Sequence, residues 1–142
     1  MSVKVLLCED NQGDIYLIEN SLAQSKADYS IDYLLTGEEV MRYLRQEANY
    51  RYASRPDIVI LDLNLPGRHG FEILAEIKAD PLLKAMPVVV LSSSKAKQDI
   101  FNSYRLHASC YIVKPSDLKA FLAAIKQIEK FWFNCVALPQ LE

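Results

Sequence analysis

The chain has 142 residues, 51% hydrophobic and 24% charged, with 16 basic residues against 18 acidic ones and a formal net charge of −2. This length fits one compact domain, and the composition excludes a disordered chain. The charge argues against a nucleic-acid partner, because binding to a phosphate backbone needs a basic excess. Aliphatic runs such as Ile58 to Leu61 fall short of the roughly 20 residues that span a bilayer, so we expect no membrane partner. The first residues do not suit a secretory signal, because Glu9 and Asp10 soon interrupt the apolar run, so we expect a cytoplasmic protein.

Five short apolar runs have the length and flanking turn residues of strands. In chain order they are Val3 to Cys8, Ser30 to Leu34, Ile58 to Leu61, Val88 to Leu91, and Cys110 to Val113. Segments with helical spacing alternate with them: Gln12 to Gln24, Glu38 to Arg45, Phe71 to Lys78, Lys97 to Leu106, and a last stripe of Leu118, Phe121, Leu122, Ile125 and Ile128. The alternation predicts an α/β fold, a doubly wound parallel sheet of five strands flanked by five helices.

Polar residues follow four of these strands. Glu9 and Asp10 follow the first strand, Asp62 the third, Ser92 the fourth and Lys114 the fifth. Each alone has an ordinary explanation as a helix cap, a turn residue or a solvated lysine. The carboxyl ends of parallel strands meet at one edge of the sheet, where ligands bind. Four strand ends with complementary groups therefore favour a single shared site.

The predicted site has the chemistry of phosphoryl transfer. Carboxylates this close repel one another unless a cation lies between them, and oxygen ligands suit Mg²⁺. The cation recruits phosphate oxygens, to which Lys114 adds positive charge and Ser92 adds a hydrogen-bond donor. A carboxylate in that setting can attack phosphorus, and Asp62 is the expected nucleophile.

The residues at the strand ends, in this order along the chain, resemble those of the receiver domain of two-component response regulators. The resemblance extends from Val3 to about Glu129. It implies a flavodoxin-like fold with strand order 2-1-3-4-5, and a receiver domain over residues 1–129. It also implies that the protein catalyses only its own phosphorylation and dephosphorylation.

The resemblance assigns roles within the site. It implies that Asp62 accepts the phosphoryl group and that Lys114 pairs with that group. Glu9, Asp10 and Asp62 match the carboxylates that hold Mg²⁺, and Asn64 matches the residue whose main-chain carbonyl completes the metal site.

Two further matches concern the response to phosphorylation. Ser92 corresponds to the switch hydroxyl and Tyr111 to the switch aromatic residue of the family. The peptide bond before the matching proline is commonly cis, so the resemblance implies a cis Lys114-Pro115 bond.

Further motifs are similar to the single-domain regulators that partner phytochrome-type histidine kinases. They are Asp10-Asn11 followed by Asp14, the tyrosine-bearing loop before Arg55-Pro56-Asp57, the run Asp62-Leu63-Asn64-Leu65-Pro66-Gly67, and the ending Phe131-Trp132 to Leu138-Pro139. The similarity implies a phytochrome-type histidine kinase as phosphoryl donor. The output is then phosphorylation-dependent binding to a downstream protein that the sequence does not identify.

Two other functions use a similar sheet. Mg²⁺-dependent phosphatases and phosphotransferases with an aspartate nucleophile carry a second aspartate two residues later as general acid, where this chain has Asn64. Dinucleotide binding needs glycine patterns that are absent from this sequence. A receiver domain is therefore the preferred interpretation, with the phosphatase as the alternative.

Two apolar regions remain as candidate contact surfaces. In the first helix, Leu17, Ile18 and Leu22 suffice for the core, so we expect Ile15 or Tyr16 to be exposed. Receiver domains dock their kinase through this helix, so the resemblance implies Ile15 as a kinase contact.

The second region is the extension over residues 130–142, which carries Phe131, Trp132 and Phe133. This extension either folds back over the domain or joins a homodimer. The related phytochrome partners pair through the fourth helix, last strand and last helix, so we expect a homodimer.

Overall fold

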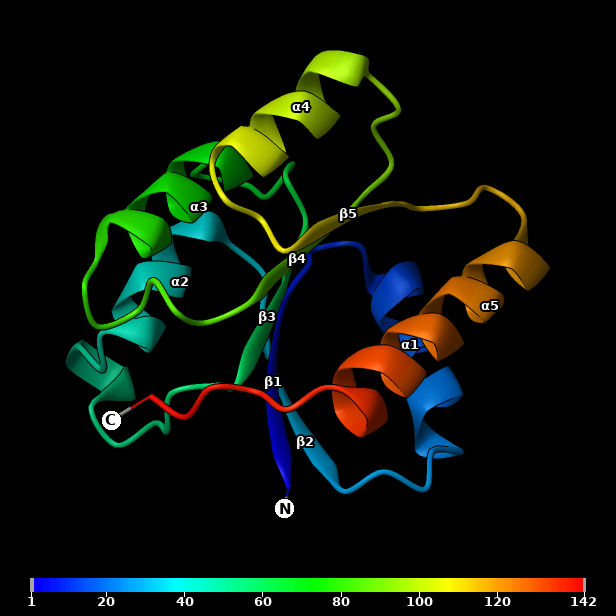
Figure 1. Cartoon of the computed structure of the whole chain (residues 1–142), viewed down its shortest axis with the longest axis horizontal. Coiled ribbons are helices and arrows are strands. Elements are labelled where there is room, and N and C mark those ends of the chain that lie inside the picture. The colour runs from blue at the N-terminus through cyan, green and yellow to red at the C-terminus, as the bar shows by residue number, and fades with distance from the viewer. Residues whose placement is uncertain (1, 142) are drawn as a thin grey trace.

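The computed structural model describes residues 2–141 and confirms the predicted α/β fold (Figure 1). The described strands form one parallel sheet in the order β2-β1-β3-β4-β5. They are β1 (Val3–Cys8), β2 (Tyr29–Leu34), β3 (Ile58–Leu61), β4 (Val88–Ser92) and β5 (Cys110–Val113). The helices are α1 (Gln12–Ala23), α2 (Gly37–Leu44), α3 (Gly70–Ala79), α4 (Lys97–Arg105) and α5 (Leu118–Ile128), with a 3₁₀ turn η1 (Ala48–Tyr50) and a π-helical segment η2 (Glu129–Cys135).

Helices cover both faces of the sheet, and side chains along each strand alternate between the two faces. On β1, Leu6 and Cys8 join the cluster under α2 and α3, whereas Val5 and Leu7 join the cluster under α1 and α5. Figure 1 shows α1 and α5 together on one face and α2, α3 and α4 on the other. Because β3 and β4 are buried on both faces, their sequences are continuously apolar.

The observed bounds differ from the predicted ones by one residue at most at each end. The long loop between α2 and β3 contains one element that the sequence pattern did not predict, the turn η1. The backbone is left-handed at Gln46 (φ 58°), shortly before this turn, and at Ala48 (φ 53°), its first residue. Such a short turn has no periodicity of its own, so a hydrophobic pattern cannot reveal it.

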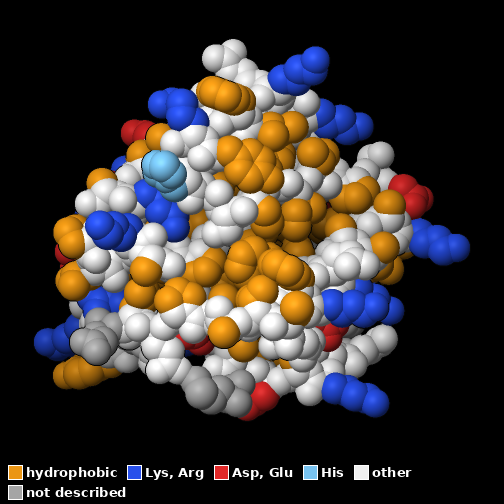
Figure 2. All heavy atoms as spheres, viewed as in Figure 1, with side chains coloured by type: hydrophobic (Ala, Val, Ile, Leu, Met, Phe, Trp, Pro, Cys, Tyr) orange, Lys and Arg blue, Asp and Glu red, His pale blue; other side chains and the backbone are white. Residues whose placement is uncertain are grey.

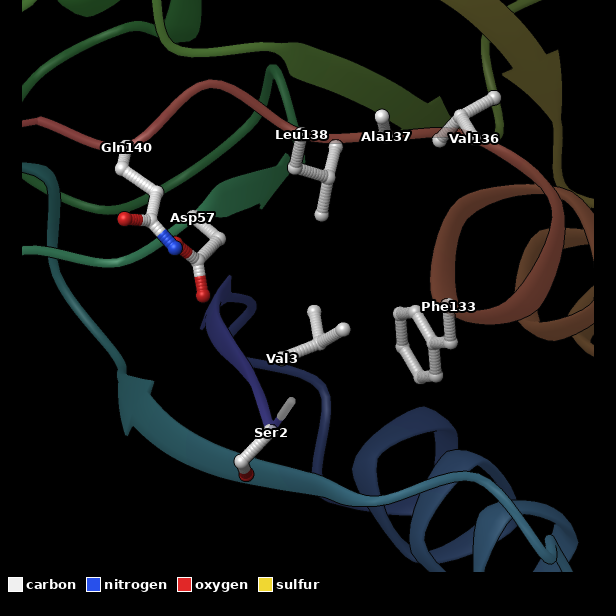
Figure 3. Close-up of a pocket in the computed structure, with 8 residues that line it drawn as sticks. All are labelled: Ser2, Val3, Asp57, Phe133, Val136, Ala137, Leu138 and Gln140. Atoms are coloured by element: carbon white, nitrogen blue, oxygen red, sulfur yellow. The ribbon is translucent and has the colours of Figure 1, made fainter.

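The end of the chain folds back along the edge of the sheet where the strands begin. The segment η2 turns Phe133 into the core, where it is 8% exposed and its ring lies 5.5 Å from the ring of Tyr29. Residues 136–138 and 140 then pass the amino ends of the strands and, with Val3, line a cavity of about 400 Å³ (Figure 3). The expectation that Phe133 is available to a partner is therefore wrong, because the wider π-helical turn directs it inward.

Other apolar side chains of this region stay at the surface. Phe131 is 50% exposed and packs edge-on against the partly buried Trp132, with ring centroids 5.1 Å apart. Leu118, which we expected in the core stripe of α5, is 56% exposed because it stands at the first position of the helix, beyond the sheet. Phe101 and Tyr104 of α4 are also exposed. Figure 2 shows hydrophobic side chains gathered between α4 and α5 on this face.

Two negative findings hold for residues 2–141. No helix there combines the length and the apolar character needed to cross a bilayer. The three cysteines form no disulfide: Cys8 is buried in β1, Cys110 is partly buried in β5, and Cys135 is exposed in η2.

Candidate functional site

The register of the sheet brings the predicted site residues to one edge. The main-chain N–H of Asp62 donates to the carbonyl of Cys8 at 3.0 Å, so Asp62 lies beside the end of β1 and the following Glu9. At the other side, the N–H of Lys114 donates to the carbonyl of Ser92 at 2.7 Å. The ends of β1, β3, β4 and β5 therefore form a single crevice, as the sequence predicted.

The ammonium of Lys114 lies at the centre of this crevice. Its Nζ donates to Glu9 Oε1 at 2.5 Å, to Asp14 Oδ2 at 3.0 Å and to Asp62 Oδ2 at 3.2 Å. The side chain of Lys114 is only 11% exposed, so water screens these contacts weakly. Three carboxylates thus share one cation.

Three acidic residues have the geometry of a metal site. Glu9, Asp10 and Asp62 each place a carboxylate oxygen within 4.8 Å of the other two. Glu9 is 1% exposed and Asp62 is 7% exposed, whereas Asp10 faces solvent. An all-oxygen donor set that is open on one side fits a hard divalent cation, with room for water or phosphate oxygens.

Protonation in the crevice reflects this crowding. Burial raises the pKa of Glu9 to about 7; the hydrogen bond from Lys114 opposes the rise, and the charge of Asp62 adds to it. Burial alone would lower the pKa of Lys114, but hydrogen bonds to Glu9 and Asp14 and the charge of Asp62 outweigh it and raise that pKa. The lysine therefore stays charged.

Ser92 and Tyr111 both form hydrogen bonds with Ser94, in the loop after β4. Ser92 is fully buried at the end of β4, and its Oγ accepts a hydrogen bond from the N–H of Ser94 at 3.2 Å. The hydroxyl of Tyr111 donates to the main-chain carbonyl of Ser94 at 2.8 Å. Ser94 thus connects the serine and the tyrosine that the sequence singled out.

Asn64 stands at the edge of the same crevice. It lies two residues after Asp62, and its N–H donates to Asp62 Oδ1 at 3.2 Å. Its carbonyl as a metal ligand stays a prediction.

Two expectations about the crevice are wrong. Ile15 is 8% exposed and packs in the core below α1, whereas its neighbour Tyr16 is 64% exposed, because the core stripe of α1 is rotated toward Ile15. The described residues contain no cis peptide bond, so Lys114-Pro115 is trans, the isomer that is favoured intrinsically.

Asp14 belongs to the motif that starts at Asp10, but the sequence pattern predicts no place for it in the site. Asn11 caps α1 by accepting from the N–H of Asp14 at 2.9 Å, and this places Asp14 in the first turn, above the crevice. Its position in the first turn of the helix after β1 was the one signal in the sequence that could have placed Asp14 near the crevice.

An acidic cluster beside a lysine at the carboxyl edge of a 2-1-3-4-5 sheet is the arrangement expected of a receiver domain, and comparison with known families agrees. Residues 5–126 match the response regulator receiver domain. The chain belongs to this family.

Individual relatives are similar over nearly their whole length. The chain is 42% identical over 135 residues to Response regulator Rcp1 of Synechocystis sp., covering 95% of this chain and 92% of that protein. Its fold matches the phosphorylated cyanobacterial phytochrome response regulator RcpA with a TM-score of 0.95, 49% identity and coverage of 99% and 100%. It also matches the Mn²⁺-bound form of Rcp1 with a TM-score of 0.95, 40% identity and coverage of 97% and 99%.

Proposed function

We propose that this response regulator accepts a phosphoryl group on Asp62, with Mg²⁺, from a histidine kinase of the phytochrome type. The observation that carries the proposal is the contact of Lys114 Nζ with both Glu9 and Asp62 beside the three-carboxylate cluster. The similar Rcp1 and RcpA structures hold, respectively, a divalent cation and a phosphoryl modification.

The transfer has a simple atomic balance. A carboxylate oxygen of Asp62 attacks the phosphorus of a phosphohistidine, the new O–P bond forms as the N–P bond breaks, and the departing imidazole takes up a proton. Lys114 supplies positive charge next to Asp62, at 3.2 Å from Oδ2. A Mg²⁺ ion held by Glu9, Asp10 and Asp62, with the carbonyl of Asn64, would neutralise the negative charge that develops on the phosphoryl oxygens.

Similar proteins that are phytochrome response regulators support the kinase type. Structures similar to this one include the cyanobacterial phytochrome regulator RcpA and the bacteriophytochrome regulators RtBRR and AtBRR, at 49%, 33% and 32% identity.

A cytoplasmic location agrees with the three free cysteines, since thiols persist in reducing compartments.

Phosphorylation is tested with the purified chain, a small phosphodonor and Mg²⁺. Intact-mass measurement should show one added phosphoryl group, and EDTA or Asp62→Asn should prevent its addition. Asp28→Asn is a matched control. Asp28 is exposed and directly precedes β2, so it lies at the amino ends of the strands, whereas the crevice lies at their carboxyl ends. Labelling that persists in Asp62→Asn would contradict the assignment. A phytochrome kinase carrying labelled phosphohistidine should transfer its label to the wild-type chain in the same assay.

We further propose that the chain does not turn over external phosphate esters. Asn64 stands where aspartate-nucleophile phosphatases need a general acid, and an amide cannot protonate a leaving group. Steady hydrolysis of a generic phosphate monoester would contradict this.

We also propose that the protein forms a homodimer through the face between α4 and α5 and signals to a downstream protein. The support is the exposed apolar surface of Phe101, Tyr104 and Phe131, with the partly buried Trp132 beside Phe131 and an adjoining groove over Cys110 and Ile128. Clustered exposed aromatic residues are typical of interfaces.

A further inference from the structure

Asp14 contacts Lys114 but is not one of the three carboxylates of the candidate metal site. The ammonium of Lys114 has three N–H groups, and the structure pairs each with a different carboxylate: Glu9, Asp14 and Asp62. Two of these, Glu9 and Asp62, belong to the carboxylate cluster that fits a divalent cation, whereas Asp14 does not. A bound cation would therefore compete with Lys114 for Glu9 and Asp62, but not for Asp14.

The position of Asp14 is built into the start of α1. Its N–H is fixed by the side chain of Asn11, and its Oδ2 lies 3.0 Å from Lys114 Nζ. The side chain of Asp14 is 23% exposed and that of Lys114 is 11% exposed. This pair is more shielded than the freely solvated pairs that contribute almost nothing.

A cation in the cluster would change the balance of these contacts. Glu9 and Asp62 would then share their negative charge with the metal, and each would hold the ammonium more weakly. Asp14 would keep its full charge for Lys114. Asp14 contacts Lys114 through its own Oδ2, so it holds the lysine without occupying an oxygen of Asp62.

We propose that Asp14 is a positioning residue for phosphoryl transfer: it holds Lys114 Nζ in place so that one N–H stays directed at Asp62. This role rests on the proposed function, because it concerns the same transfer. Asp14 does not touch the reacting atoms and acts only through the lysine.

The test compares Asp14→Ala, Asp14→Asn and the control Asp28→Ala in phosphorylation by a small phosphodonor at saturating Mg²⁺. Asp14→Ala should slow phosphorylation about fivefold, the size expected for losing one shielded charge-assisted hydrogen bond. Asp14→Asn keeps an acceptor oxygen and should slow it about twofold. Asp28→Ala should match the wild type.

Two further measurements separate positioning from a general effect. In a Lys114→Ala background, Asp14→Ala should slow phosphorylation no further, because the group it positions is gone. In the wild-type chain with Mg²⁺, the ¹⁵N spectrum of lysine ammonium groups should show a protected Lys114 signal, and Asp14→Ala should abolish that protection.

The outcomes are distinct. If Asp14→Ala leaves the rate of an active wild-type chain unchanged, or slows it equally with and without Lys114, the inference is overturned while the proposed function stands. If the wild-type chain accepts no phosphoryl group, both fall. The role is supported if Asp14→Ala loses both rate and ammonium protection in the chain that keeps Lys114, and loses no further rate in the Lys114→Ala background.

Discussion

The hydroxyl of Tyr111 donates to the main-chain carbonyl of Ser94 at 2.8 Å, and so ties β5 to the loop that follows β4. The N–H of Ser94 donates in turn to Oγ of Ser92. On the outer side, the N–H of Tyr111 donates to the hydroxyl of Tyr104 on α4 at 3.1 Å. A continuous set of hydrogen bonds therefore leads from the buried serine of the crevice to the exposed face between α4 and α5.

We predict that Ser92→Ala permits phosphorylation but weakens the structural response. The phosphoryl group adds acceptor oxygens that Ser92 can satisfy, and this difference in contact is what a two-state switch requires. Tyr111→Phe, which removes only the hydroxyl bound to Ser94, should also reduce the response. The measurement is the phosphorylation-dependent shift of amide signals in α4 and β5, which we expect to fall severalfold. Unchanged shifts in both variants would refute the coupling.

We predict that substitution of Phe133 lowers stability, whereas substitution of Phe131 weakens the dimer. Phe133→Ala should lower the free energy of unfolding by about 3 kcal/mol, the usual cost of emptying a buried phenylalanine site, because Phe133 packs against Tyr29. Phe131→Ala should change stability by less than about 0.5 kcal/mol and weaken the dimer instead. Light scattering measures the second effect. A wild-type chain that stays monomeric at high concentration, with and without phosphodonor, would rule out the dimer.

We predict that Gly70→Ala is strongly destabilising. A Cβ at Gly70 would lie 2.6 Å from the Cα of Leu63 and 3.1 Å from the carbonyl of Asp62. The backbone at Asp62 and Leu63 would have to move, at a cost of about 2 kcal/mol or more. The same substitution at Gly13 meets only the side-chain oxygen of Asn11 and serves as control. Urea denaturation compares the two, and equal midpoints would contradict the close approach.

We predict an acid-dependent contribution from Glu76, which bridges α2 and the loop before α3. Its carboxylate pairs with Arg45 at 2.5 Å and with Arg68 at 2.8 Å. Partial burial favours the neutral carboxyl, but hydrogen bonds and charges from Arg68 and Arg45 outweigh it and lower the pKa of Glu76 below its ordinary value of 4.5. The stabilisation is thus present above the ordinary value and is lost as pH falls through the lowered one.

Glu76→Gln should accordingly cost about 0.5 to 1 kcal/mol at pH 7, discounted for solvent screening, and progressively less as the pH falls below the ordinary value of 4.5. Unfolding followed at several pH values measures this. Glu47→Gln, at an exposed position in the α2–β3 loop, should show no such dependence, and a difference from wild type that is constant with pH would contradict the prediction for Glu76.

Much of the fold and of the crevice followed from the sequence because both depend on strand pattern. Residues at the ends of parallel strands must converge, so Glu9, Asp62 and Lys114 could be placed together without coordinates. The bounds of the helices were also predictable, since apolar spacing is a local property.

What could not be predicted depends on packing between distant segments. Successive helix residues are rotated by about 100°, so a small rotation of α1 decides whether Ile15 or Tyr16 is buried. The inward turn of Phe133 requires a π-helical segment, for which the hydrophobic pattern carries no signal. The contact of Asp14 with Lys114 joins residues 100 positions apart through side chains alone.

The distribution of the cysteines has a practical consequence. Burial, with the charge of Glu9, raises the pKa of the Cys8 thiol, and burial likewise raises that of Cys110, with Trp132 opposing. Cys135 alone is exposed, and the thiolate is the reactive form. A maleimide dye should therefore attach at Cys135 without any engineered residue. Because η2 leads into the stretch beneath the amino ends of the strands, such a dye would report association of two chains while leaving the crevice of Asp62 untouched.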